Sequence, residues 1–187
     1  MATSKNNVVT HGLSGKVADL LVFSQRNGKT IVGKVPDKTH VHQSDKQKET
    51  VHKFQEAVIY AKSAISDNTT KDAYQGKAGG GVSAYNLALA DFMNAPDIDE
   101  VDLSGYTGKA GQQIVVRATD DFKVVYVTVA IYGSNGALVE QGNAALSANG
   151  LDWVYITTAE TGEPVGDKIV IRASDIPGNV TEKSKVI

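Results

Sequence analysis

The sequence has no cysteine among its 187 residues. This absence excludes disulfide bonds, thiolate metal sites and a cysteine nucleophile. No apolar run approaches the roughly 18 residues that a membrane-spanning helix needs. The start, MATSKNNVVTHG, lacks a basic segment followed by an apolar one, so it does not resemble a Sec signal. We expect cytoplasmic synthesis and no membrane insertion, and any export would need a machine that requires no N-terminal signal.

The chain also has little excess charge of either sign, because its formal net charge is only −2. Its distribution is uneven: residues 1–53 carry nine Lys/Arg and four Asp/Glu (+5), whereas residues 100–187 carry seven and eleven (−4). Lys46, Lys48 and Lys53 alternate with acidic residues, which is typical of a solvated helix face and not of a basic stripe. We therefore expect no nucleic-acid partner.

The composition changes near residue 96. All four histidines and the helical patterns precede this point, and alternating β-branched residues follow it. The segment NAPDIDE at 94–100 has the Pro and the charges of a linker. The sequence thus predicts an α+β adaptor domain over 1–96 and an all-β domain over 100–187.

The N-terminal part contains a strong hairpin signal. An Asn-Gly dipeptide at 27–28 separates LLVFSQ from TIVGKV, and it favours a type I′ turn because both turn positions need a positive φ. This turn would pair Arg26 with Lys29 and place Phe23 opposite Val32.

Glycine, serine and lysine just before the hairpin look like pieces of a catalytic loop. A phosphate-binding loop would need Ser or Thr after Lys16, where Val17 stands. A nucleophile elbow would need glycine at position 16. The structural interpretation of this stretch is therefore favoured over a catalytic one.

Two helices are predicted next. Ser44 and Gln47 form a capping box before a helix of about twenty residues, and a second helix ends before Pro96. The apolar stripe of the first helix consists of Val51, Phe54, Val58, Ala61 and Ile65, and that of the second of Val82, Tyr85, Leu89 and Phe92.

The C-terminal part reads as short strands at even spacing. They are EVDLSGY, QIVVRATD, VVYVTVAIY, ALVEQGNA, LDWVYITTA, KIVIRASD and VTEKSKV. Seven strands in fewer than ninety residues, with Trp153 to fill the core, predict a β-sandwich of immunoglobulin-like or fibronectin-III-like type.

Two groups of residues are candidate metal ligands. His40, His42 and His52 suit zinc, or they are exposed polar side chains of a loop and a helix start. Carboxylates at strand ends suit calcium, or they form turns by bonding their own backbone; these are Asp120, Asp121 and Asp175. We expect no resident cofactor.

Loops on a rigid sandwich are the expected binding surface, because they vary without disturbing the core. The candidate binding residues are Asp120, Asp121, Ser134, Asn135, Asp175 and Asn179. No triad motif frames any serine, and adjacent acids such as Asp120 and Asp121 point to opposite faces of a strand. We therefore expect no catalytic residues and no enzyme.

Three stretches carry a resemblance to a known family. They are HGLSGKVADLLVFSQRNGKTIVGKVP, QKETVHKFQEAVIYAKSAI and SAYNLALADFMNAPDIDEVDLSGYTG. Together they resemble a family of small uncharacterised proteins from Bacteroidota, with L-S-G-K-V and N-G-K-T as shared elements. The tail VIRASDIPGNV is similar to the last strands of bacterial Ig-like modules. Val35 departs from the pattern, which has a basic residue before Pro36.

The resemblance implies an association with phage-derived extracellular contractile injection systems. On that basis the protein is expected to be a non-enzymatic cargo or accessory protein with an Ig-like binding module. A structural component of a phage-like particle and an unrecognised hydrolase are the alternatives. The particle tube, an assembly component or a target-cell surface molecule would be the protein partner.

Overall fold

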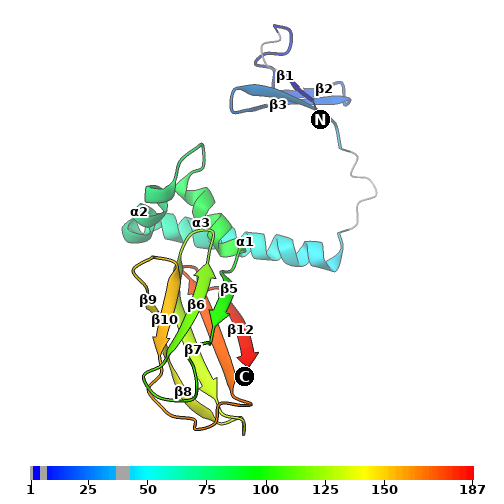
Figure 1. Ribbon diagram of the computed structural model, residues 1–187. Coiled ribbons are helices and arrows are strands. Elements are labelled where there is room, and N and C mark those ends of the chain that lie inside the picture. Colours follow the sequence, from blue (N-terminus) through cyan, green and yellow to red (C-terminus); the bar gives the residue numbers. More distant parts are fainter. Residues whose placement is uncertain (1, 5–7, 37–42) are drawn as a thin grey trace. The chain divides into compact units, whose positions relative to one another are not determined.

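The computed structural model describes residues 2–4, 8–36 and 43–187 (Figure 1). Contacts divide the chain into two compact units, Met1–Asp45 (unit 1) and Lys46–Ile187 (unit 2). The boundary expected near residue 96 lies inside unit 2, where a helix is followed directly by a strand. Among the described helices, none combines the length and the apolar character needed to cross a bilayer.

Unit 1 is a four-stranded antiparallel sheet in the order β1-β4-β3-β2. Its strands are β1 (Ala2–Ser4), β2 (Gly15–Val17), β3 (Leu21–Arg26) and β4 (Lys29–Lys34).

The hairpin predicted from Asn-Gly is confirmed. Asn27 and Gly28 have φ angles of 49° and 72°, as a type I′ turn requires. Arg26 pairs with Lys29, and Phe23 lies opposite Val32.

Gly28→Val should destabilise the β3–β4 hairpin by about 1–3 kcal/mol, because a β-branched residue is strained at positive φ. Gly33→Val is the matched control, since Gly33 lies in β4 with open space around an added Cβ and no positive φ. Hydrogen exchange of the β3 and β4 amides measures the effect. Equal protection in the two variants would contradict the turn assignment.

The helices of unit 2 are α1 (Asp45–Ser66), α2 (Asn68–Lys77) and α3 (Ala84–Met93). Asp67 caps α2 by accepting the Thr70 N–H at 2.8 Å, and Ser83 caps α3 by accepting the Asn86 N–H at 3.3 Å.

The buried faces of the helices match the predicted stripes in part, because Ala61 is buried and Ile65, Tyr85 and Leu89 are partly buried against the helical apolar residues. In α1 the buried residues are Ala57, Ala61 and Ala64, and in α3 they are Ala84, Ala88 and Asp91. Val51 and Phe54, at the start of the predicted stripe, are exposed. Alanine lines the contact because small side chains let a helix approach its neighbours closely.

The rest of unit 2 is a sandwich of two antiparallel four-stranded sheets, ordered β5-β6-β10-β9 and β12-β11-β7-β8. The first contains β5 (Asp97–Asp102), β6 (Gln113–Thr119), β10 (Asp152–Ile156) and β9 (Ala145–Leu146). The second contains β12 (Val180–Val186), β11 (Lys168–Asp175), β7 (Val124–Tyr132) and β8 (Leu138–Asn143). The structure thus combines a few helices with mostly antiparallel sheets, and the predicted β-sandwich character is confirmed.

The sandwich core follows from alternation along the strands, because side chains at every second position face the opposite sheet. The alternating buried residues are Ile114, Val116 and Ala118 in β6, Val127, Val129 and Ile131 in β7, and Ile169, Ile171 and Ala173 in β11. Trp153 of β10 is 8% exposed and belongs to the same cluster, as expected.

The helices close one end of this sandwich (Figure 1). A second apolar cluster joins Ala61 of α1, Tyr74 of α2 and Ala88 of α3 to Phe122, which lies in the loop between β6 and β7. Ile176, just after β11, packs against the same cluster. Helices and sandwich therefore belong to one packed unit.

Glu140 of β8 links the two sheets. Its Oε2 accepts hydrogen bonds from the Tyr155 hydroxyl at 3.1 Å and from the hydroxyl and N–H of Thr158 at 2.6 and 2.8 Å. The N–H of Ala159 donates to it at 3.3 Å. Burial alone would raise the pKa of Glu140, but these hydrogen bonds outweigh burial and hold the pKa below its usual range.

The stability that Glu140 contributes should be present at neutral pH and lost as the pH falls below 4.5, the usual pKa of glutamic acid, because its folded-state pKa is lower than that value. Glu140→Gln should lower the free energy of unfolding by about 1–3 kcal/mol at neutral pH. Its acid destabilisation should also be weaker than that of the wild type. Denaturant unfolding over this pH range measures both, with exposed Glu160→Gln as control. Identical pH profiles for wild type and Glu140→Gln would contradict this role.

Candidate functional site

Three carboxylates meet where the helices contact the sandwich: Asp91, Asp120 and Asp175. One oxygen from each lies within 4.8 Å of the others. Asp91 is placed there by α3, because it follows Ala84 and Ala88 on the buried face at helical spacing. Asp120 directly follows β6, and Asp175 ends β11. We call these three side chains the acidic cluster.

Hydrogen bonds hold each member of the acidic cluster. The Tyr74 hydroxyl donates to Asp91 Oδ2 at 2.5 Å. The Tyr60 hydroxyl lies 2.9 Å from that of Tyr74, and it is the donor there because Tyr74 gives its hydrogen to Asp91. A chain of two tyrosines from α1 and α2 therefore ends on the carboxylate of α3.

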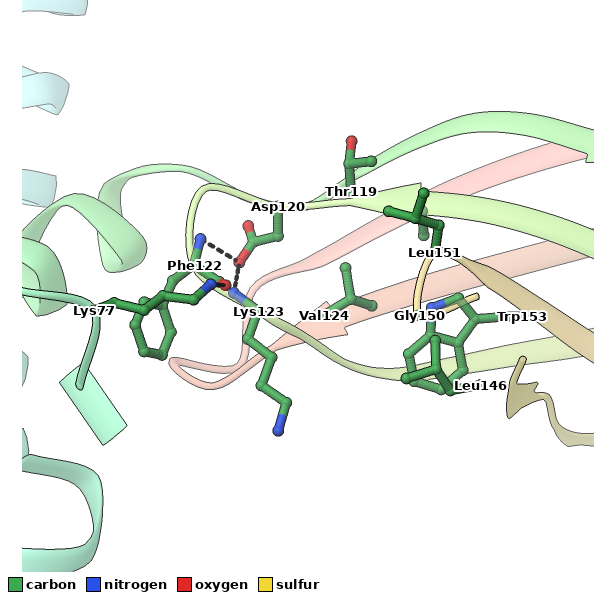
Figure 2. A pocket seen from close by; sticks show the side chains of 11 residues that line it. Lys77, Thr119, Asp120, Phe122, Lys123, Val124, Leu146, Gly150, Leu151 and Trp153 are labelled. Carbon is green, nitrogen blue, oxygen red and sulfur yellow. Dashed lines mark hydrogen bonds between the residues drawn. The ribbon is translucent and has the colours of Figure 1, made fainter. Parts of the chain in front are cut away.

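The two sandwich carboxylates are held by turns. Figure 2 shows Asp120 accepting the backbone N–H groups of Phe122 and Lys123, at 3.1 and 2.7 Å. Asp175 Oδ1 accepts the N–H groups of Gly178 and Asn179, at 2.9 and 2.6 Å. Each carboxylate thus stabilises the loop that follows its own strand.

Asn179 ties the turn after β11 to α3. Its Nδ2 lies 2.7 Å from Asp175 Oδ2 and within 3.1–3.3 Å of the backbone oxygens of Asp91, Phe92 and Asn94. These oxygens lie at the C-terminal end of α3, where carbonyl groups lack partners within the helix. The amide therefore caps α3 from the sandwich side.

Burial dominates the electrostatics of the cluster. Burial raises the pKa of Asp91 to about 7, against a lowering by the Tyr74 hydrogen bond, and the charges of Asp120 and Asp175 raise it further. Burial also raises the pKa of Asp175 and of Tyr74. Among the described residues, no Lys, Arg or His forms an ion pair with any of the three carboxylates.

A hollow of about 340 Å³ adjoins this end of the sandwich (Figure 2). Its lining includes Lys77, Asp120, Phe122 and Trp153. The Lys77 ammonium donates to the backbone oxygen of Phe122 and lies 4.7 Å from the centre of that ring. This contact fixes the C-terminal end of α2 on the β6–β7 loop.

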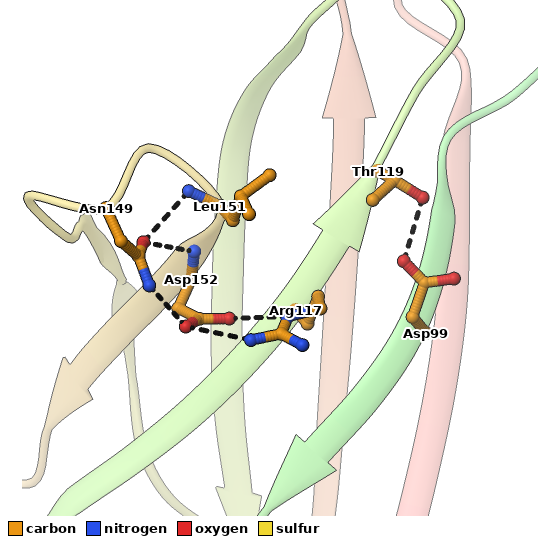
Figure 3. Close-up of polar contacts among 6 residues, drawn as sticks. All are labelled: Asp99, Arg117, Thr119, Asn149, Leu151 and Asp152. Atoms are coloured by element: carbon orange, nitrogen blue, oxygen red, sulfur yellow. Dashed lines mark hydrogen bonds and ion pairs between the residues drawn. The ribbon is translucent and has the colours of Figure 1, made fainter.

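A polar network lies on the outer face of the β5-β6-β10 sheet (Figure 3). The Arg117 guanidinium pairs with both carboxylate oxygens of Asp152, at 2.8 and 3.1 Å. Asn149 Nδ2 donates to the same carboxylate at 2.6 Å, and Thr119 donates to Asp99 at 2.8 Å. These groups satisfy one another and stabilise strand pairing.

The structure brings together two of the three predicted calcium candidates. Asp120 and Asp175 both belong to the acidic cluster, whereas Asp121 accepts a hydrogen bond from Asn94 at 2.5 Å and is not part of it. Asp91 was missed by the sequence analysis. The sequence could have indicated it, because Ala84, Ala88 and Asp91 follow one another at helical spacing and so share one face of the helix.

The other candidates lie apart. His40 and His42 are outside the described residues, and His52 is an exposed residue of α1. Ser134 and Asn135 are exposed in the turn between β7 and β8, at the opposite end of the sandwich from the acidic cluster. Asn179, in contrast, lies beside the cluster and contacts α3.

Tyr74→Phe should lower the free energy of unfolding by about 1–3 kcal/mol, because the buried carboxylate of Asp91 loses the hydroxyl donor that Tyr74 supplies. Tyr126→Phe is the matched control, since Tyr126 is 60% exposed. Denaturant unfolding gives both values. Equal stability of the two variants would show that the Tyr74–Asp91 contact contributes nothing.

No protein-family model and no curated protein sequence matches this chain. Among solved structures, it is similar to CopC from Methylosinus trichosporium OB3b, with 19% identity, 48% of this chain and 87% of that chain covered, and a TM-score of 0.34. It is also similar to the Bifidobacterium dentium β-glucuronidase complexed with coumarin-3-O-glucuronide, with 14% identity, coverage of 50% and 17%, and a TM-score of 0.29. Neither similarity is strong enough to bear on function.

Proposed function

We propose that the protein is a non-enzymatic cargo or accessory protein of an extracellular contractile injection system, which docks through unit 1 and presents an Ig-like module in unit 2. The family resemblance of the sequence is the source of the particle assignment. The single observation that supports docking is the incomplete burial of unit 1.

The described residues of unit 1 form a single sheet layer without a second layer of their own. Among its described side chains only Thr30 is buried, and neither apolar cluster of the protein includes a residue of this unit. Its exposed apolar residues are Val8, Val9, Leu13, Val17, Leu20 and Leu21. A sheet normally buries one face against another element, so a protein surface is a suitable cover.

The charge of unit 1 indicates which kind of partner surface it would contact. Unit 1, residues 1–45, carries six Lys/Arg and three Asp/Glu, a formal charge of +3, so an acidic tube lumen or assembly face is the complementary surface. Attraction between exposed charges is screened as the Debye length falls from about 10 Å at 0.1 M salt to about 3 Å at 1 M. Docking is therefore salt-sensitive under this proposal.

The strand order supports the Ig-like part of the proposal. The first, second and fifth of the seven long strands of the sandwich form one sheet (β5, β6 and β10, with short β9), and the remaining strands form the other. An immunoglobulin-type sandwich divides its strands in this way. The buried tryptophan departs from that pattern. In immunoglobulin domains it lies on the third strand, which corresponds to β7 here, whereas Trp153 lies on β10.

Co-sedimentation of the full chain with contractile particles purified from the producing bacterium tests the proposal. We expect substoichiometric association that weakens between 0.1 and 1 M salt. Leu20→Asp should reduce it more than about tenfold, because docking would bury an unpaired charge. Val165→Asp is the matched control, since Val165 is 72% exposed and Leu20 67%, but Val165 lies in unit 2.

Three outcomes would contradict parts of this account. Absence of the protein from the particle fraction overturns the particle assignment. Stoichiometric incorporation or self-association favours the structural-component alternative. Association that is insensitive to both Leu20→Asp and salt places the docking surface outside unit 1.

A further inference from the structure

We propose that Asp91, Asp120 and Asp175 bind one calcium ion, which joins α3 to the two sandwich loops at this end of unit 2. The proposal is independent of the particle assignment, because it rests on the acidic cluster alone.

The first observation is uncompensated negative charge. Three carboxylates lie within 4.8 Å of one another, and no described basic side chain pairs with them. Like charges at this spacing repel strongly where burial lowers the effective dielectric constant. A bound cation reverses the sign of that interaction.

The second observation is a pair of oxygens without hydrogen-bond donors. Asp91 is only 1% exposed, and its Oδ1 has no hydrogen-bond partner. Asp120 Oδ1 is likewise buried without one. Buried polar atoms are nearly always satisfied, so these two acceptors are the oxygens that a cation bound in the cluster would satisfy.

The hydrogen bonds of the cluster fit the supporting shell of a metal site. Asp91 and Asp120 each use Oδ2 for hydrogen bonds and leave Oδ1 available. Asp175 is fixed by the N–H groups of its turn and by Asn179. Metal ligands are commonly oriented by outer hydrogen bonds of this kind. The carboxylates are therefore held in position before an ion binds.

The donor set points to calcium. All three ligands are carboxylate oxygens, which hard cations prefer, and no histidine takes part in the cluster. Calcium binds oxygens at about 2.3–2.6 Å in flexible geometry, so oxygens on opposite sides of one ion lie about 4.6–5.2 Å apart. Three oxygens that all lie within 4.8 Å of one another can therefore contact one calcium ion together. Waters complete the coordination.

The test uses the full chain freed of metal with a chelator. Millimolar calcium chloride should raise the melting temperature by several degrees, because the ion binds the folded state only. Terbium, which replaces calcium at oxygen sites, should show tyrosine-sensitised emission, because Tyr74 contacts Asp91 directly. Excess calcium should displace the terbium signal, and magnesium should do so less effectively.

Two isosteric variants give the site its specificity test. Asp91→Asn should weaken terbium binding at least about tenfold and abolish the calcium-dependent rise in melting temperature. Asp121→Asn should leave both unchanged, because Asp121 is the neighbour of Asp120 but lies outside the cluster. If Asp91→Asn does not fold, Asp120→Asn replaces it.

Several results would overturn the proposal. Wild-type protein that shows neither a calcium-dependent melting shift nor sensitised terbium emission has no such site. Equal loss of binding in Asp91→Asn and Asp121→Asn indicates only general attraction to acidic surface. A third result is a wild-type melting temperature that is independent of calcium, together with a higher melting temperature of Asp91→Asn. This result would identify a proton shared between two carboxyl groups instead of a bound ion.

Discussion

The packing of unit 2 depends on placing the carboxyl group of Asp91 in the interface between α3 and the sandwich. A carboxylate that is 1% exposed is costly unless donors or a cation compensate it. Tyr74 supplies one donor from α2, and Asp120 and Asp175 bring further negative charge from the sandwich. The side chain of Asp91 therefore lies where α2, α3 and the two sandwich loops meet.

This constraint explains why the helices and the sandwich form one unit while the N-terminal sheet forms another. Apolar packing through Phe122 and Ile176 brings the helices to the sandwich end, and Asn179 caps α3 from the same side. Apolar contact supplies most of the attraction between helices and sandwich. The polar groups fix how α3 sits on the sandwich, because few arrangements satisfy their hydrogen bonds. Unit 1 has neither a second layer nor a comparable cluster among its described residues.

Local patterns in the sequence were sufficient for the long strands of the sandwich and for the β3–β4 hairpin, but not for the short strands β1 and β2. Alternating residues such as Ile114 and Val116 bury every second side chain, and Asn27-Gly28 dictates its turn through positive φ. The helix faces were less predictable, because alanines make the close contacts whereas larger residues such as Phe54 stay exposed. A ranking by hydrophobicity alone would bury Phe54 before the alanines, which is the reverse of what the structure has.

The acidic cluster was predictable only in part, because its members are distant in sequence and meet through tertiary packing. Asp120 and Asp175 were identified from their places at strand ends, but nothing local links them to α3. Hydrogen exchange of the full chain tests most directly whether helices and sandwich are one unit organised around Asp91. We predict that α3 and β11 amides open with the same free energy and lose protection together in Asp91→Ala. Exchange of α3 at a much lower free energy, with β11 unaffected by the substitution, would contradict this account.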